Sequence, residues 1–115
     1  MADSDARFDA FDIVVVPFPY SDRLAEKRRP ALVVSNKRLK ALGLVWVAMI
    51  TSAENESWPD DVPIRDVSRA GLPAPSIVRP AKIACIDPGR VLRRSGKLDK
   101  ATARTVAQRV RRFLG

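Results

Sequence analysis

The chain has 115 residues, of which 46% are hydrophobic, so it is long enough for one domain with its own core. It contains no histidine, which excludes Ser-His-Asp and Cys-His catalysis, RNA cleavage by paired imidazoles, and histidine-based zinc sites. A net charge of +8 and a pI near 10.6 predict a polyanionic partner, with nucleic acid the first candidate. The plainer alternative is a surface that happens to be basic.

The cysteine content and the N-terminus indicate the compartment. Cys85 is the one cysteine and cannot form an internal disulfide, which fits a reducing cytoplasm. Its apolar surroundings predict a buried core residue. The N-terminus lacks the pattern of a signal peptide, and no apolar run approaches the roughly 20 residues that span a bilayer. We expect a cytoplasmic protein with no membrane partner, formed by a single domain over residues 1–115 with residues 1–10 flexible.

The first half of the chain predicts strands separated by polar loops. Ile13–Phe18 is a continuous β-branched run and predicts a buried strand, which should end or lie at an edge at Pro17. The charged segment 21–29 predicts a mobile loop. Beyond it, the pattern predicts a second strand over 31–35, a helical turn over 36–42, a third strand over 44–51 and a polar loop over 52–60.

The second half predicts more short strands and a terminal helix. Strands are expected over 61–64, 76–79, 82–87 and 91–94, with a helical turn over 67–70 that Gly71 ends. Asp99 is a candidate N-cap. After it, apolar residues recur at helical spacing at Ala103, Val106, Ala107, Val110, Phe113 and Leu114. We predict a mainly β fold: a small, mostly antiparallel barrel with a C-terminal helix.

Two charged features have a plain explanation. The terminal helix carries Arg104, Arg109, Arg111 and Arg112 on its second face. This face could bind nucleic acid, but a solvated face is the favoured reading. Adjacent Asp60 and Asp61 would point to opposite sides of a strand, so no carboxylate cluster predicts a metal or another cofactor.

Arg29 and Thr51 stand at positions where chemistry could occur. Pro30 biases Arg29 toward an extended backbone, and a guanidinium matches two phosphate oxygens at once. Thr51 ends the third predicted strand, where its hydroxyl can bond a phosphate oxygen. Taken alone, the two would be read as a surface arginine and a strand-terminating residue.

Three segments, 11–20, 28–35 and 47–52, resemble the MazF/PemK family of toxin endoribonucleases. In that family, an arginine before a proline in the second strand and a threonine that ends the third strand are assigned to catalysis. The resemblance therefore implies that Arg29 and Thr51 are catalytic. It also implies a homodimer with a small SH3-like barrel of the MazF/PemK/CcdB type, acting as the toxin of a type II toxin–antitoxin pair.

The implied activity is metal-independent cleavage of single-stranded RNA, often mRNA, at short sequences. The 2′-OH would attack the adjacent phosphate and leave 2′,3′-cyclic phosphate and 5′-OH ends. The implied partners are single-stranded RNA and a cognate acidic antitoxin whose tail fills the RNA groove, with DNA binding only through the antitoxin complex. RNA-binding residues are expected around both loops: Tyr20, Arg23, Lys27, Arg28, Ser52, Trp58 and Arg79. Trp58 is the best candidate for base stacking.

The chain departs from the PemK branch at two positions. In that branch an arginine matching Arg79 is followed two residues later by an aspartate, where this chain has Ala81, and a histidine stands in the first loop, where this chain has Asp22 and Arg23. Two alternatives therefore stay open. One is a toxin of the CcdB type that acts on DNA gyrase, although the tryptophan near the C-terminus of that type is missing. The other is an inactive nucleic-acid-binding module.

Overall fold

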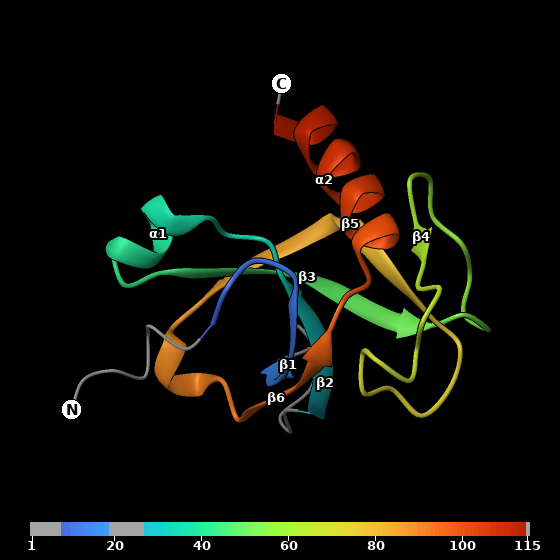
Figure 1. Cartoon of the computed structure of the whole chain (residues 1–115), viewed down its shortest axis with the longest axis horizontal. Coiled ribbons are helices and arrows are strands. Elements are labelled where there is room, and N and C mark those ends of the chain that lie inside the picture. The colour runs from blue at the N-terminus through green and yellow to red at the C-terminus, as the bar shows by residue number, and fades with distance from the viewer. Residues whose placement is uncertain (1–7, 19–26, 115) are drawn as a thin grey trace.

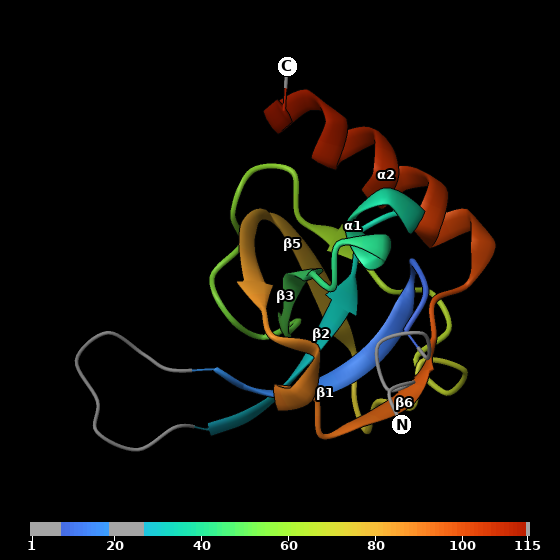
Figure 2. The ribbon, with the colours of Figure 1, turned by 90° about the vertical axis from the view of Figure 1, so that its left-hand side faces the viewer.

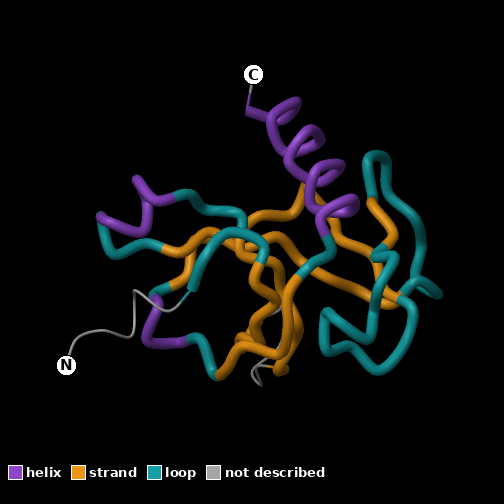
Figure 3. The backbone as a smooth tube through the Cα atoms, in the orientation of Figure 1, coloured by secondary structure: helices purple, strands orange, loops and turns teal. Residues whose placement is uncertain are grey.

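The computed structural model describes residues 8–18 and 27–114. One curved antiparallel sheet has the strand order β4-β5-β3-β2-β1-β6, and the C-terminal helix lies against it (Figures 1 and 3). The predicted mainly β fold with a terminal helix is confirmed. The elements are β1 (Asp12–Phe18), β2 (Lys27–Val33), α1 (Lys37–Ala41), β3 (Val45–Ser52), β4 (Val62–Pro63), β5 (Ser76–Ile86), η2 (Pro88–Arg90), β6 (Arg93–Lys97) and α2 (Lys100–Leu114).

The β-branched strands are buried on both faces, and each face has its own apolar cluster. Because side chains alternate along a strand, β1 supplies Ile13 to one cluster and Val14 to the other. The first cluster packs against α2 and includes Leu32, Ile50, Val78, Ala103 and Val106. The second lies on the opposite face and includes Val16, Ala31, Val33 and Val47. The helix α2 therefore covers the face that carries the first cluster and does not cover the face that carries the second.

Asp99 caps α2, as its sequence position predicts. Both carboxylate oxygens accept bonds from Thr102: the backbone N–H donates at 3.0 Å, and the hydroxyl donates at 2.8 Å. Burial alone would raise the pKa of Asp99, but these hydrogen bonds outweigh it and hold the pKa below its ordinary value. The charged cap thus fixes the point at which the chain leaves β6 and becomes a helix.

The hairpin of β1 and β2 differs from the prediction. The segment 21–29 was expected to be a loop, but β2 already begins at Lys27, so Lys27–Arg29 pair with β1. Arg29 lies opposite Val16, and Pro17 lies opposite Arg28. Pairing with β1 holds these charged residues in an extended conformation, although their own sequence shows no strand-like alternation. Pro17 does lie at an edge, because β6 pairs only with residues 12–15 of β1.

The second half contains three further corrections. Residues 76–86 form one strand with a bulge, not two strands: Met49 lies opposite Arg79, whereas Ala48 lies opposite Ile83. Pro80 at this point cannot donate a ladder bond, which favours a bulge there. The last strand covers residues 93–97 instead of 91–94, and residues 67–70 form turns, not a helix.

Cys85 is exposed, so the prediction of a buried core residue was wrong. Past the bulge, β3 is the one strand that pairs with β5 among the residues the structure describes, because β4 pairs with Ile77 and Val78. An edge segment buries fewer of its side chains than a central strand. This leaves an apolar run partly in solvent.

Residues 8–10 are the described part of the segment predicted to be flexible. Phe8 packs against the cluster of Val14 and Val16, and Lys40 of α1 donates to Asp9 at 2.6 Å. The hydrogen bond and charge of Lys40 lower the pKa of Asp9. None of the described helices is long and apolar enough to cross a membrane.

Candidate functional site

The strand register brings Arg29, Thr51 and Arg79 to one face of the sheet. Ala31 and Met49 form the last pair of β2 with β3, and Arg29 and Thr51 each stand two residues from a member of that pair. Met49 also pairs with Arg79, and Thr51 with Ile77. Residues two apart on a strand share a face, so all three polar residues lie on the face opposite α2. Segments that are distant in sequence thus place two arginines and a threonine on one face of the sheet.

Arg29 is held by an ordered strand pair instead of a loop. The ends of β1 and β2 project beyond the body of the molecule (Figure 2). Arg29 is half-buried, and Arg28 beside it is exposed. Together with Arg93 of β6 they line a pocket of about 540 Å³, whose wall also contains Leu72. Three arginines at one hollow concentrate positive charge where a phosphate could approach.

Thr51 is oriented by the turn that follows β3. The Asn55 side chain donates to Thr51 Oγ1 at 2.5 Å, so the hydroxyl proton of Thr51 can point toward another acceptor. Ser52 Oγ accepts the backbone N–H of Glu54 at 3.2 Å, and the Asn55 N–H donates to the Ser52 carbonyl. The turn therefore positions Thr51 as a donor, and Ser52, whose Oγ accepts a bond within the turn, keeps its hydroxyl proton for another acceptor.

Arg79 forms a buried ion pair. Its Nε and Nη2 donate to the two carboxylate oxygens of Asp61 at 3.1 and 3.0 Å, and Nη2 also donates to the Glu56 carbonyl at 2.7 Å. The side chains of Arg79 and Asp61 are 8% and 5% exposed. The Arg79 guanidinium lies 4.3 Å from the centre of the Trp58 ring. Arg79 thus joins β5 to the loop that carries Trp58.

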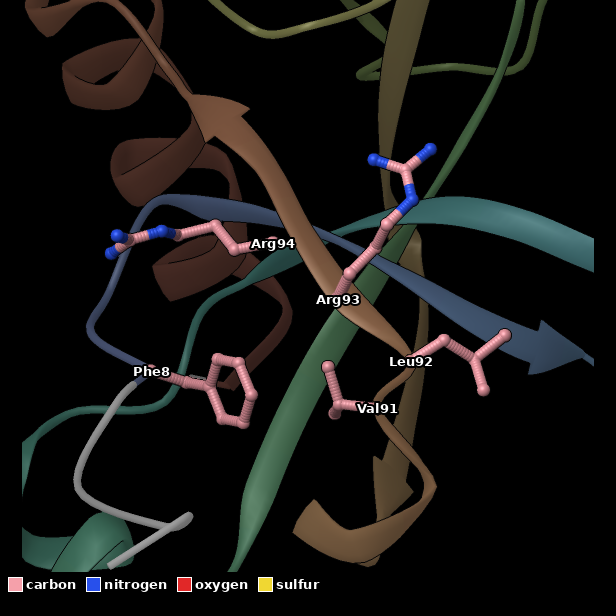
Figure 4. Close-up of a pocket in the computed structure, with 5 residues that line it drawn as sticks. All are labelled: Phe8, Val91, Leu92, Arg93 and Arg94. Atoms are coloured by element: carbon pink, nitrogen blue, oxygen red, sulfur yellow. The ribbon is translucent and has the colours of Figure 1, made fainter.

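A second hollow adjoins the first. Phe8, Val91, Leu92, Arg93 and Arg94 line a pocket of about 550 Å³ (Figure 4). The Phe8 ring and Val91 face each other at its base, while the two arginines point in different directions. Arg94 reaches toward the buried carboxylate of Asp12 at 3.5 Å. Because Arg93 lines both hollows, positive charge continues from the β1–β2 pair to the start of β6.

Other predicted positions give a mixed result. Tyr20 and Arg23 lie outside the described residues, and the structure places Lys27 only as the first residue of β2. Ala81 is exposed at the bulge, two residues past Arg79. Within residues 8–18 and 27–114, no three His, Cys, Asp or Glu side chains gather as a metal site.

Sequence reasoning missed Asp61, Asn55 and Arg93. Asp61 was considered only as a metal ligand, because nothing in the chain marks it as the partner of an arginine 18 residues away. Asn55 had one usable signal: it lies four residues after Thr51 in a polar turn. Arg93 follows an apolar residue at the start of a strand, and only the sheet order shows that β6 lies beside β1.

The comparisons with known proteins agree with this fold. A sequence model described as the PemK-like, MazF-like toxin of type II toxin–antitoxin systems matches residues 9–114. A crystal structure of MazF from Deinococcus radiodurans is similar with a TM-score of 0.72 and 23% identity, covering 94% of this chain and 96% of that one. No curated protein sequence matches the chain.

Two mycobacterial structures are also similar. The Mycobacterium tuberculosis toxin MazF-mt6 has a TM-score of 0.70 and 22% identity, over 90% of this chain and 95% of that one. A mycobacterial endoribonuclease solved with its cognate antitoxin has a TM-score of 0.74 and 16% identity, over 94% and 95%. These likenesses establish the small barrel, and the family match extends over nearly the whole chain. The chain therefore belongs to the PemK-like, MazF-like family of toxins of type II toxin–antitoxin systems.

Proposed function

We propose that this toxin is a metal-independent, sequence-specific endoribonuclease that cleaves single-stranded RNA. The observation that supports the proposal is that strand alternation puts Arg29 and Thr51 on the same face of the sheet, opposite α2. A fixed guanidinium and a hydroxyl donor on one surface suit a phosphate that gains negative charge during reaction.

The nucleophile is the RNA's own 2′-OH. It attacks the adjacent phosphorus, the bond to the 5′-oxygen breaks, and the products carry a 2′,3′-cyclic phosphate and a 5′-OH. Arg29 and the Thr51 hydroxyl oppose the charge that develops on the phosphate oxygens. Arg29 does not act as the general base, because an arginine stays protonated at any pH that proteins tolerate. It is suited to charge stabilisation and to proton donation toward the leaving oxygen.

The surrounding arginines guide the rest of the strand. Arg28 and Arg93 line the hollow beside Arg29, and they would hold phosphates on either side of the scissile one. Ser52 and Lys27 would complete the track at the ends of β3 and β2. Bases that are unstacked in a single strand can then reach the aromatic residues near these strands.

The proposed partner is a cognate acidic antitoxin, and the proposed active unit is a homodimer in the cytoplasm. The mycobacterial structure described as an endoribonuclease with its cognate antitoxin supports an antitoxin by likeness. The net charge of +8 suits an acidic, disordered segment that folds as it binds over the same arginines. Such a segment would block RNA access.

The activity is tested by incubating the purified protein in EDTA with a long single-stranded RNA and with DNA of the same sequence. Arg29→Ala is assayed beside Arg104→Ala, a matched control that removes the same charge from the exposed face of α2. We expect cleavage of RNA only, retained by Arg104→Ala and lost by Arg29→Ala. Because the Arg29 side chain belongs to neither apolar cluster, the folded state of the variant should persist and can be checked by circular dichroism.

Near-normal cleavage by folded Arg29→Ala protein would refute the assignment of Arg29. Intact RNA in every sample, from a folded dimer, would refute the nuclease itself. In that case gyrase inhibition and RNA binding without cleavage become the next assays.

A further inference from the structure

Trp58 stands at the start of a tight turn, Trp58-Pro59-Asp60-Asp61. The Asp61 N–H donates to the Trp58 carbonyl at 3.3 Å, and the Trp58 N–H donates to Asp61 Oδ2 at 2.8 Å. Pro59 and the positive φ of 70° at Asp60 suit the two central positions of a type II turn. Two hydrogen bonds within the turn therefore fix the backbone that carries the indole ring.

The same turn is tied to the protein on two sides. Asp61 binds Arg79 of β5 through both carboxylate oxygens, and the Arg79 guanidinium lies over the Trp58 ring at 4.3 Å. Asp60 faces the other way, where Arg112 and Arg109 of α2 approach its Oδ1 at 3.3 and 3.9 Å. A ring in a polar loop is thus anchored to both a strand and a helix.

The ring nevertheless stays accessible. Trp58 is 39% exposed, although its anchors Arg79 and Asp61 are almost fully buried. The ammonium of Lys82 lies 5.8 Å from the ring centre. The exposed Trp58 ring could stack on a nucleobase, and the Lys82 ammonium beside it could bind the phosphate of the same nucleotide.

The position of this ring relative to Thr51 defines which ligand it could meet. Arg79 is the diagonal neighbour of Thr51 across β3 and β5, since Thr51 pairs with Ile77. Diagonal neighbours in an antiparallel pair lie about 7–8 Å apart. A strand of RNA whose phosphate sits at Thr51 would therefore pass the Trp58 ring with an adjacent nucleotide.

We propose that Trp58 is a rigid nucleobase-stacking subsite next to the scissile phosphate, and that Asp61 is the positioning residue that holds it. The proposal rests on the proposed function for the location of the phosphate, but base binding at Trp58 can be measured without cleavage. Asp61 acts through Arg79 and the Trp58 backbone and does not itself touch the base. Lys82 takes the phosphate that follows the stacked nucleotide.

The probe is a 2′-O-methyl adenylate dodecamer, which lacks the attacking hydroxyl and cannot be cleaved. An abasic dodecamer with the same phosphate backbone serves as the control ligand. The protein carries Trp46→Phe, which leaves Trp58 as its only tryptophan. We expect the adenylate to quench Trp58 fluorescence strongly and to bind tighter than the abasic strand. Equal binding and equal quenching by the two strands would overturn the proposal.

Replacing the ring tests its contribution directly. In wild-type background, Trp58→Ala should weaken adenylate binding by about 5- to 150-fold, the usual effect of one base–aromatic stack. Binding of the abasic strand should not change. Loss of affinity for both strands alike would instead show that the loop matters only for folding or charge.

The neighbouring aspartates provide a matched pair for the positioning role. Asp61→Asn removes the charge that holds Arg79, whereas Asp60→Asn removes only the ion pairs to α2. In the Trp46→Phe background, Asp61→Asn should lower the fluorescence anisotropy of Trp58 and its adenylate affinity, while Asp60→Asn leaves both near normal. If Asp61→Asn does not fold, Arg79→Lys, which keeps the charge but not the two-pronged bond, gives the same test. Unchanged anisotropy and affinity in the folded variant would refute the positioning role.

The two proposals fail in different ways. Base-dependent quenching without any RNA cleavage would refute the nuclease and leave the subsite standing. Cleavage retained at full rate and unchanged sequence preference in Trp58→Ala would refute the subsite and leave the nuclease standing.

Discussion

An arginine in a paired strand is held more firmly than one in a loop, because its backbone has lost its freedom before any ligand arrives. Arg29 pairs with Val16, whose side chain is fully buried, and Pro30 follows it. Part of the entropy cost of ordering the guanidinium is therefore met in folding. Preorganisation of this kind is what electrostatic stabilisation of a phosphate requires.

Thr51→Val should isolate the hydroxyl, since valine keeps the shape and strand preference of threonine. Loss of one donor to the developing charge should slow RNA cleavage by about 10²- to 10³-fold. The rate of cleavage of a short RNA at saturation is the measurement. Thr105→Val on α2 is the control, because it makes the same change far from the site. Equal rates for both variants would show that the Thr51 hydroxyl takes no part.

Asp99→Ala should destabilise the fold by about 0.5–2 kcal/mol at pH 7, the usual cost of losing an N-cap. The pKa of Asp99 is lowered in the folded state, so its contribution is complete above the ordinary value of 3.8 and is lost as pH falls through the lower folded value. The stability gap to wild type should therefore shrink in acid. Urea unfolding at pH 7 and pH 3 measures it, with Asp99→Asn as a cap that carries no charge. A gap that widens in acid would contradict the sign.

At the scale of elements, the turn segment formed by residues 67–71 packs closely against β6 at two glycines. Gly71 has a φ of +73°, and a Cβ there would stand 2.1 Å from the Ser95 carbonyl oxygen. A Cβ on Gly96 would stand 2.4 Å from the backbone of Arg69 and Ala70. This close approach places Gly71 and Leu72 in the wall of the pocket that Arg29 lines.

Gly96→Ala should therefore destabilise the protein by about 1–3 kcal/mol, the typical cost of overpacking. The obstructing atoms are backbone atoms and cannot rotate away. Gly89→Ala is the control, because the nearest atom to a Cβ there is the end of the Asp87 side chain at 3.4 Å. The midpoint of urea unfolding should fall for Gly96→Ala and stay close to wild type for Gly89→Ala. Equal midpoints would mean that β6 and the turn segment separate without cost.

The elements that the sequence predicted well are those with a strong local signal. The β-branched runs at Ile13 and Val47 and the periodic helix after Asp99 could be recognised from residues alone. The start of β2 could not, because Lys27–Arg29 become a strand only by pairing with β1. The bulge at Pro80 was likewise interpreted as a break between strands. Cys85 was misplaced because burial depends on which neighbour a strand has.

In the candidate site, too, some features could be predicted from the sequence and others could not. Arg29 and Thr51 were predicted from the family resemblance, and the register adds that they share a face. The ion pair of Arg79 with Asp61 joins residues whose chain positions carry no common signal. Trp58 was predicted from composition of its loop, but the groups that fix its ring became visible only in three dimensions.

At the scale of the whole molecule, the arginines behind the net charge of +8 have different surroundings on different faces. On α2, Arg109 and Arg112 are engaged by Asp60, and Arg104 faces solvent. Beside β1, β2 and β6, Arg28, Arg29 and Arg93 line one hollow. The molecule therefore offers a polyanion a concave basic surface, and under the proposed function that surface would serve both the RNA and the antitoxin.

Binding of an acidic antitoxin segment should be tight and sensitive to salt. Raising the ionic strength from about 0.1 to 1 M shortens the Debye length from about 10 to about 3 Å, which screens the attraction of exposed charges. The Kd measured by titration calorimetry should rise steadily over this range. Arg29→Ala should reduce the dependence, whereas Arg104→Ala on the far face should not. An affinity that stays constant across the range would rule out an electrostatic complex.

The central claim is that Arg29 promotes attack by the RNA's own 2′-OH, and the chemistry of the product ends tests it most directly. The cleaved RNA is analysed by mass spectrometry, beside an RNA with a single 2′-deoxy nucleotide before the scissile phosphate. The account predicts 2′,3′-cyclic phosphate and 5′-OH ends in EDTA, no cut at the deoxy position, and no cut by Arg29→Ala. Cleavage at the deoxy position, or 5′-phosphate ends, would contradict it, because neither can arise from attack by the neighbouring hydroxyl.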